Sequence, residues 1–316
     1  MAGMYDAPLI SPENKDSNSE IYASLPKIEL AAAVEPAQDI AKAFTETLDA
    51  LESENVIYAE IRLNPADFAE ALGDGTVVDL LANAKTAIDD HKVDARIILE
   101  TTTDADNVSE LAEFAIHSDD IAGYALIGND IPAHHETLRK LNENFVPVVV
   151  EGDFQAIEAG VKAGATRINA GIDIIDDFSA TVEGIQPGVV TGWIRDRHIT
   201  VELQPDDDVA NGDADTLADH PLPLLQQLGF TCAVGAASLT DQFTSLNENM
   251  GYGLEEFFEL TVAAIQNSFS DQEHRQHIIE TIILPAYEEF SSTEFAEDAA
   301  AREAAEADHD DEDDTE

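Results

Sequence analysis

The stretch from residue 95 to residue 127, ARIILETTTDADNVSELAEFAIHSDDIAGYALI, predicts one strand–helix–strand unit. Its two ends, residues 95–100 and 122–127, are short runs of apolar and β-branched side chains, which are typical of buried parallel strands. The longer amphipathic stretch between them, residues 104–117, predicts a helix with Asp104 as its N-cap. Two strands joined by a crossover helix form a βαβ unit.

The same alternation continues in both directions along the chain. Eight strands are expected, at residues 28–34, 56–63, 95–100, 122–127, 145–150, 166–169, 199–203 and 230–234. The helices between them are expected at residues 37–51, 76–90, 104–117, 132–142, 154–163, 189–197 and 221–228. Eight strands with interleaved helices predict an α/β fold of the (β/α)8 TIM barrel type, with extra C-terminal helices at 253–269 and 271–290. An open doubly wound sheet is the alternative, which the lack of a glycine-rich motif after any strand disfavours.

Charge limits the classes of partner. The 316 residues contain 66 acidic and 15 basic side chains, a formal net charge of -51, so we expect neither nucleic-acid nor membrane-surface binding. Three segments are predicted: a flexible leader over 1–24, a barrel domain over 25–292 and an acidic, disordered tail over 293–316. The tail is a candidate site for a basic protein partner.

Cysteine content and hydropathy point to a cytoplasmic protein. The single cysteine, Cys232, excludes an internal disulfide framework and fits a reducing compartment. The N-terminal segment lacks the basic start and apolar core of a signal peptide, and no apolar run is long enough to span a bilayer.

In a TIM barrel the chemistry lies at the carboxyl ends of the strands. In this sequence those ends carry carboxylates, amides and small residues but no histidine; they include Ala31, Ala33, Glu35, Arg62, Asn64, Asn129, Asp130, Glu151, Asp153, Asn169 and Gln204.

Several motifs, in order along nearly the whole chain, resemble the adenosine deaminase family. LPKIEL at residues 25–30 resembles its first strand, YAEIR at 58–62 its second, and GYALIGND at 123–130 its GIDLAGDE segment. ATRINAG at 165–171 resembles the family's AERIGHG, and HP at 220–221 with TSL at 244–246 resembles the flanks of the last strand. The resemblance implies a TIM barrel that uses one zinc ion to remove the 6-amino group of adenine nucleosides.

The resemblance also implies where the metal ligands should lie. The two histidines of the first strand correspond to Ala31 and Ala33, and the histidine of the family's HAGE motif corresponds to Val150. The metal aspartate of the last strand corresponds to Ala237, with Ser238 beside it, and the catalytic histidine corresponds to Ala170. Alanine and valine offer no donor atom, so we expect no zinc at these positions and no metal-activated water.

Other features of the family's pocket are partly retained. Gly128 corresponds to the glycine that contacts the purine, and Glu35 to the acidic residue that contacts the ribose. Asp153 corresponds to the proton-donating glutamate and is one methylene shorter. We therefore predict a catalytically inactive family member that binds a purine-like ligand or a protein partner. The alternative is an active purine nucleoside deaminase that uses a relocated metal or acidic residues such as Asp153, Asp207 and Asp208.

The remaining candidates favour structural roles. We expect Asp206–Asp208 to be a solvated loop, although a hard-cation site is the alternative. The pairs His134/His135 and His274/His277 are expected on helix surfaces, Cys232 in the core, and Trp193 as an anchor of a helix on the barrel.

Overall fold

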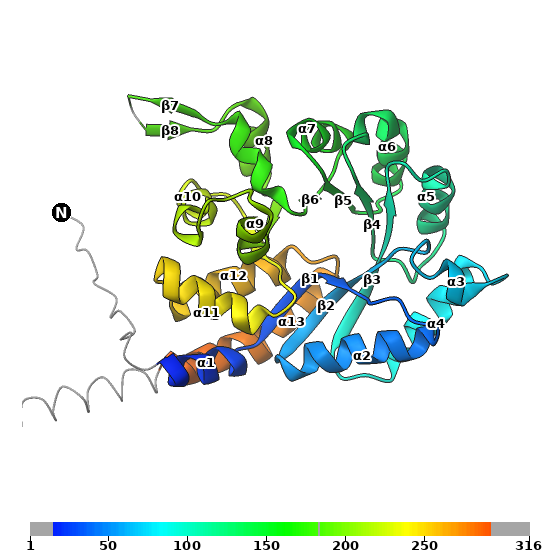
Figure 1. Cartoon of the computed structure of the whole chain (residues 1–316), viewed down its shortest axis with the longest axis horizontal. Coiled ribbons are helices and arrows are strands. Elements are labelled where there is room, and N and C mark those ends of the chain that lie inside the picture. The colour runs from blue at the N-terminus through cyan, green and yellow to red at the C-terminus, as the bar shows by residue number, and fades with distance from the viewer. Residues whose placement is uncertain (1–14, 183, 292–316) are drawn as a thin grey trace, which may run out of the picture.

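In the computed structural model, which describes residues 15–182 and 184–291, eight parallel strands form a nearly closed barrel surrounded by helices (Figure 1). Neighbouring strands pair in the order β1-β2-β3-β4-β5-β6-β9-β10. Their bounds are β1 Lys27–Ala33, β2 Val56–Leu63, β3 Asp94–Thr102, β4 Gly123–Ile127, β5 Val148–Glu151, β6 Arg167–Ile168, β9 Thr200–Leu203 and β10 Cys232–Val234. The prediction of a TIM barrel is confirmed, and each of the eight strands overlaps its predicted range.

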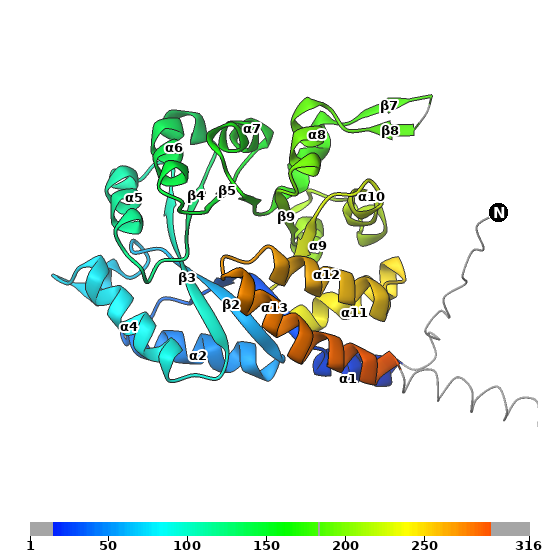
Figure 2. The ribbon, with the colours of Figure 1, turned by 180° about the vertical axis from the view of Figure 1, so that it is seen from behind.

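Helices cover the outside of the barrel and return the chain from each strand to the next (Figures 1 and 2). Between the strands lie α2 Ile40–Ser53, α3 Ala69–Leu72, α4 Val77–Asp89, α5 Val108–Ile116, α6 His135–Glu143, α7 Phe154–Ala163, α8 Val189–Asp196, α9 Pro205–Asn211 and α10 Leu222–Gln227. After β10 follow α11 Leu239–Met250, α12 Leu254–Gln266, α13 Gln272–Ile278 and the π-helical turn η4 Ile279–Ile283. Short 3-10 turns are η1 Ile131–His134, η2 Gly171–Asp177 and η3 Leu217–Asp219.

The N-terminal leader differs from the prediction. Residues 15–24 form helix α1 (Lys15–Ser24), so the prediction of a flexible leader is wrong for this part. Tyr22 is buried with its ring 5.1 Å from that of Phe257, and Leu25 is fully buried, which explains why the segment is held against the barrel. Residues 1–14 and the predicted tail from 292 onward lie outside the described residues.

Several elements have no counterpart among the predicted ones, including the short helices α3 and α9, a hairpin and helix α11. Between β6 and β9 an antiparallel hairpin of β7 (Ser179–Thr181) and β8 (Gly184–Gln186) projects away from the barrel (Figure 1). Helix α11 follows β10 and begins at Ser238, whose hydroxyl accepts a hydrogen bond from Asp241 N. Phe243 and Leu246 are both buried and form the apolar face of this helix. The many polar residues around them explain why the sequence did not predict it.

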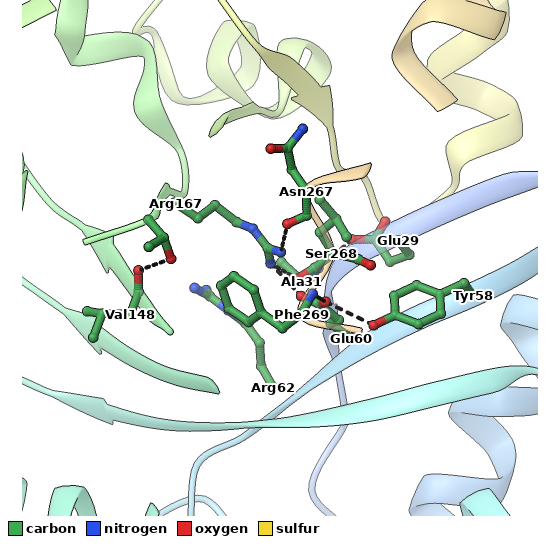
Figure 3. A network of polar contacts seen from close by, with 12 residues as sticks. Glu29, Ala31, Tyr58, Glu60, Arg62, Val148, Arg167, Asn267, Ser268 and Phe269 are labelled. Carbon is green, nitrogen blue, oxygen red and sulfur yellow. Dashed lines mark hydrogen bonds and ion pairs between the residues drawn. The ribbon is translucent and has the colours of Figure 1, made fainter. Parts of the chain in front are cut away.

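The interior of the barrel contains both an apolar layer and buried charges. Ile98, Ala125 and Val149 form an inner cluster from three adjacent strands, against which Phe269 packs. Beside it, Arg167 is 1% exposed and donates to Glu60, to Leu30 O and to Asn267 O, while its guanidinium stacks 4.1 Å from the ring of Phe269 (Figure 3). This network joins β2 and β6 to the segment that follows α12.

Candidate active-site pocket

A pocket of about 260 Å³ lies at the carboxyl ends of the strands. Its wall combines small apolar side chains with charged and amide groups. The lining residues are Ala31, Ala33, Val34, Arg62, Asp67, Phe68, Glu100, Glu151, Asn169 and Gln204. The pocket therefore lies where the sequence predicted a site, and four of its polar residues were among the strand-end residues.

Arg62 is the centre of the polar network in this pocket. Its Nε lies 3.3 Å from Glu100 Oε2, and its Nη1 donates to Glu151 Oε2 over 3.1 Å. Asn169 Nδ2 donates to the same Glu151 oxygen. Two buried atoms of the network, Arg62 Nη2 and Asn169 Oδ1, have no hydrogen-bond partner in the described part of the chain.

The side chains of the first strand face this pocket as the resemblance implies. Ala31 and Ala33 both line it, so each presents a methyl group where the family has an imidazole. A methyl group has no lone pair, whereas zinc in proteins is held by nitrogen, oxygen or sulfur ligands. These two positions do not fit a zinc ion.

The third implied position, Val150, points away from the pocket. Its side chain packs against α7, where a Cβ on Gly160 would come within 2.6 Å of Val150 Cγ1. Because side chains alternate along a strand, the next residue, Glu151, faces the interior. The residue that takes the inward position on β5 is thus a carboxylate already engaged by Arg62 and Asn169.

The remaining family positions also carry structural roles. Ala237 is exposed, and Ser238 Oγ caps α11 and donates to Glu54 Oε2 over 3.1 Å. Ala170 has a left-handed backbone, with φ of 44°, at the start of η2. None of these three side chains lines the pocket described above.

Asp153, the candidate catalytic acid, is the N-cap of α7. Its Oδ1 accepts from Ala156 N over 2.9 Å, and its own N–H donates to Asn129 Oδ1 over 2.9 Å. The two candidate ligand-binding residues lie apart from the pocket wall. Glu35 is exposed after β1, and Gly128 has φ of 124° with Thr103 Oγ1 so close that no Cβ fits there.

Two buried carboxylates lie beneath the alanines of β1. Glu29 accepts from Ala31 N over 2.9 Å, and burial, reinforced by the nearby Glu202 charge, raises its pKa to about 8. Burial also raises the pKa of Glu202 to about 6, against the opposing effect of Arg167. Neither oxygen of Glu202 has a hydrogen-bond partner among residues 15–182 and 184–291. A Cβ on Gly235 would lie 2.5 Å from Glu202 Oε1 and 3.5 Å from Glu29 Oε1, so the two carboxylates face the same point.

Glu29 and Glu202 were not identified as site residues from the sequence. A signal was present, because each is the single charge inside an apolar strand, in IELA and VELQ. Glu100 was predicted as the last residue of its strand and was not identified as a site residue. It faces the pocket because β3 continues to Thr102 and side chains alternate along a strand, so Glu100 points to the same side as the interior residue Ile98.

The prediction that Asp206–Asp208 form a solvated loop is wrong, because these residues lie in helix α9 and Asp208 is buried. Within the described residues, neither this acidic cluster nor the histidine pairs form a metal site. Asp208 is buried and its Oδ2 lies 2.9 Å from His220 Nε2, so it is not available to join Asp206 and Asp207 around a cation. His134 Nε2 bonds to Thr103 O over 2.9 Å, whereas His135 is half-buried beside Glu136. His274 pairs with Asp94, whereas His277 is exposed and is not part of that pair.

Cys232 is buried, and burial raises the pKa of its thiol to about 12, as expected of a core residue. Trp193 contradicts the prediction that it anchors a helix on the barrel. It is 49% exposed on α8, and the guanidinium of Arg197 lies 3.1 Å from its ring centroid.

One group in the described residues has the composition of a metal site. Ligand atoms of Asp49, Glu52 and His91 lie within 4.8 Å of one another. They lie where α2 ends and just before β3 begins, at the amino ends of the strands, and so at the opposite end of the barrel from the pocket. Lys92 Nζ already pairs with Glu52 over 2.6 Å.

Comparison with known proteins identifies the family. The adenosine deaminase family model matches residues 19–285. An adenosine deaminase from Mycobacterium sp. (strain KMS) is 28% identical over 268 residues, which cover 77% of this chain and 74% of that protein.

Solved structures share the fold. An adenine deaminase from Arthrobacter aurescens aligns with a TM-score of 0.65 at 20% identity, covering 82% of this chain and 81% of that one. An amidohydrolase from Burkhoderia ambifaria with bound zinc aligns with a TM-score of 0.71 at 14% identity, covering 88% and 94%. In the described part of the chain, no helix combines the length and apolar character needed to cross a membrane. With a family model matched over most of its length, the chain belongs to the adenosine deaminase family.

Proposed function

We propose that this chain is a family member that does not catalyse zinc-dependent deamination and instead binds a small molecule in its strand-end pocket. The observation that carries the proposal is that Ala31 and Ala33 face the pocket with methyl groups. The reaction requires a metal to bring the pKa of a bound water towards neutrality, and metal affinity comes from ligand donor atoms.

The polar groups that remain do not replace the missing donors. Glu151 is bound by Arg62 and Asn169, and Glu100 also lies next to Arg62. A divalent cation between these carboxylates would have to compete with a guanidinium already in contact with both. Asp153 caps a helix through one carboxylate oxygen. These contacts support a binding role for the pocket.

The second candidate is an active deaminase with a relocated metal. The observation that favours it is the group Asp49, Glu52 and His91, whose ligand atoms lie close enough together to hold a cation. That group lies at the amino end of the barrel, so a water activated there could not attack a ligand in the pocket. Three statements stay predictions: the pocket binds a purine-like ligand, the acidic tail binds a basic partner, and the protein is cytoplasmic.

The test is a paired measurement of zinc content and adenosine deamination on the full chain. After loading with zinc and removal of excess metal, we expect no deamination, and any zinc retained by the wild type should be lost in the His91→Ala variant. That variant removes the distal group without touching the pocket. Zinc that persists at one ion per chain in His91→Ala, together with deamination of adenosine, would overturn the proposal.

A further inference from the structure

We propose that the strand-end pocket takes a small organic cation, of the amidine or primary amine class, with a planar apolar part. This inference rests on the proposed function in that it assigns a ligand to the same pocket. The proposed ligand carries a positive charge, whereas the family's nucleoside substrates are uncharged. Three properties of the pocket carry it: its unpartnered polar atoms, its charge and its apolar wall.

The polar atoms of the pocket residues that lack a full set of partners are mostly acceptors. Asn169 is 2% exposed and lines the pocket, and its Oδ1 has no partner within the described residues. Glu100 meets Arg62 through Oε2 only, which leaves Oε1 for a ligand. The one unpartnered donor on the wall is Arg62 Nη2. A ligand with several N–H groups satisfies the acceptors, because a buried polar atom without a partner is costly, and Arg62 Nη2 has no partner with or without such a ligand.

The charges on the wall also favour a cation. Three carboxylates, Asp67, Glu100 and Glu151, face a single guanidinium, that of Arg62. Burial raises the pKa of Glu100, and the neighbouring Glu151 and Asp67 add to the rise although Arg62 opposes it. The pocket wall therefore carries more negative than positive charge, and a bound cation would stabilise the ionised carboxylates. An anion such as a phosphate ester would meet the opposite field.

The opposite wall is apolar and selects for shape. Val34 and Phe68 are buried and line the pocket beside the two alanines of β1. A flat ring can lie against this wall while its charged group meets the carboxylates. Amidinium groups suit the polar wall because their paired N–H groups form charge-assisted, bidentate hydrogen bonds to carboxylates.

Three probes of nearly equal size and shape separate charge from shape. Benzamidinium carries +1, benzamide is neutral and benzoate carries -1 at neutral pH. Calorimetric titration of the full chain, with metal removed by chelation, should show benzamidinium binding about tenfold or more tightly than benzamide, since hydrogen bonds to charged groups are roughly twice as strong as neutral ones. Benzoate should not bind, and 1 M NaCl should weaken benzamidinium binding.

Variants locate the site. Glu100→Gln keeps the shape of the side chain and removes its charge, so it should weaken benzamidinium binding about tenfold and leave benzamide binding unchanged. Asp67→Asn, at an exposed rim position, should act in the same direction without affecting folding. Glu136→Gln, on a side chain 86% exposed on α6, is the matched control and should bind as the wild type does.

Several results would overturn the inference: equal affinity for benzamidinium and benzamide, no binding of either, tighter binding of adenosine than of benzamidinium, or a cation effect unchanged in both pocket variants. Because metal is removed beforehand, these outcomes are independent of zinc content. A chain that binds zinc and deaminates adenosine would therefore refute the proposed function without deciding which cation the pocket takes, and the three probes would still decide it.

Discussion

The barrel contains two groups of buried charges that differ in how completely they are satisfied. Arg167 and Glu60 form an ion pair in which Tyr58 Oη also donates to Glu60 over 3.0 Å and two backbone carbonyls accept from Arg167 (Figure 3). Glu29 and Glu202, by contrast, form no ion pair with a Lys or Arg of the described residues, and both oxygens of Glu202 lack a partner.

The Arg167–Glu60 network is structural, whereas in the Glu29–Glu202 group Glu202 lacks hydrogen-bond donors. Arg167 connects three parts of the barrel, so its contacts are made by the fold itself. Glu29 and Glu202 lie beneath Ala31 and Ala33, where the family has imidazoles. A metal-binding histidine commonly donates its second ring N–H to a carboxylate. Glu202 without a partner and Glu29 with backbone donors only, below two alanines, are consistent with such an arrangement in which the imidazoles are absent.

Removing the cation of the more fully paired group, Arg167 and Glu60, should have the largest effect. Arg167→Met leaves Glu60 buried without a counterion, so we expect the free energy of unfolding to fall by about 3–5 kcal/mol in urea denaturation. The double variant Arg167→Met/Glu60→Gln removes both charges and should recover part of that loss. A single variant that loses less than about 1 kcal/mol would show that the network contributes little.

The unsatisfied group should instead make the protein less stable as pH rises. The pKa of Glu29 is raised to about 8 in the folded chain, above the ordinary value of 4.5, so the folded state binds the proton more tightly than the unfolded state does. Stability from this group is full below about pH 4.5 and is lost as pH rises towards 8.

Glu29→Gln mimics the protonated side chain and can donate its amide N–H towards Glu202. We expect this variant to be more stable than the wild type at pH 8 to 9 by on the order of 3 kcal/mol, and equal to it near pH 4.5. Chemical denaturation at a series of pH values measures both. Glu46→Gln, on a side chain 63% exposed, controls for the general repulsion in this acidic chain. Parallel wild-type and Glu29→Gln profiles would contradict the raised pKa.

Periodicity alone predicted the barrel because each strand is buried on both sides and reads as a continuous apolar run. The run 56–63 coincides with β2, and residues 154–163 coincide with α7. The hairpin β7–β8 could not be predicted in this way, since its side chains are exposed and show no alternation. The exposed position of Trp193 and its contact with Arg197 likewise could not be predicted, because composition does not indicate either.

The pocket was predictable in place but not in detail. Ala31 and Ala33, to which motif order assigned the two histidines of the first strand, both line the pocket. On β5 the motif comparison pointed to Val150, whereas strand alternation turns Glu151 inward. Which carboxylates meet Arg62 depends on distances across the barrel, and no pattern along the chain contains those distances.

The smallest expected effect concerns Asp153, which caps α7 outside both groups of buried charges. If its role is to cap α7, Asp153→Ala should lower the free energy of unfolding by about 1 kcal/mol. Asp153→Asn should be nearly neutral, because asparagine caps helices as well as aspartate does. If Asp153 instead donated a proton in catalysis, both variants would be inactive in an activity assay, including the stable Asp153→Asn. Urea denaturation of the two variants, alongside any turnover measured for the wild type, therefore separates a helix cap from a catalytic acid.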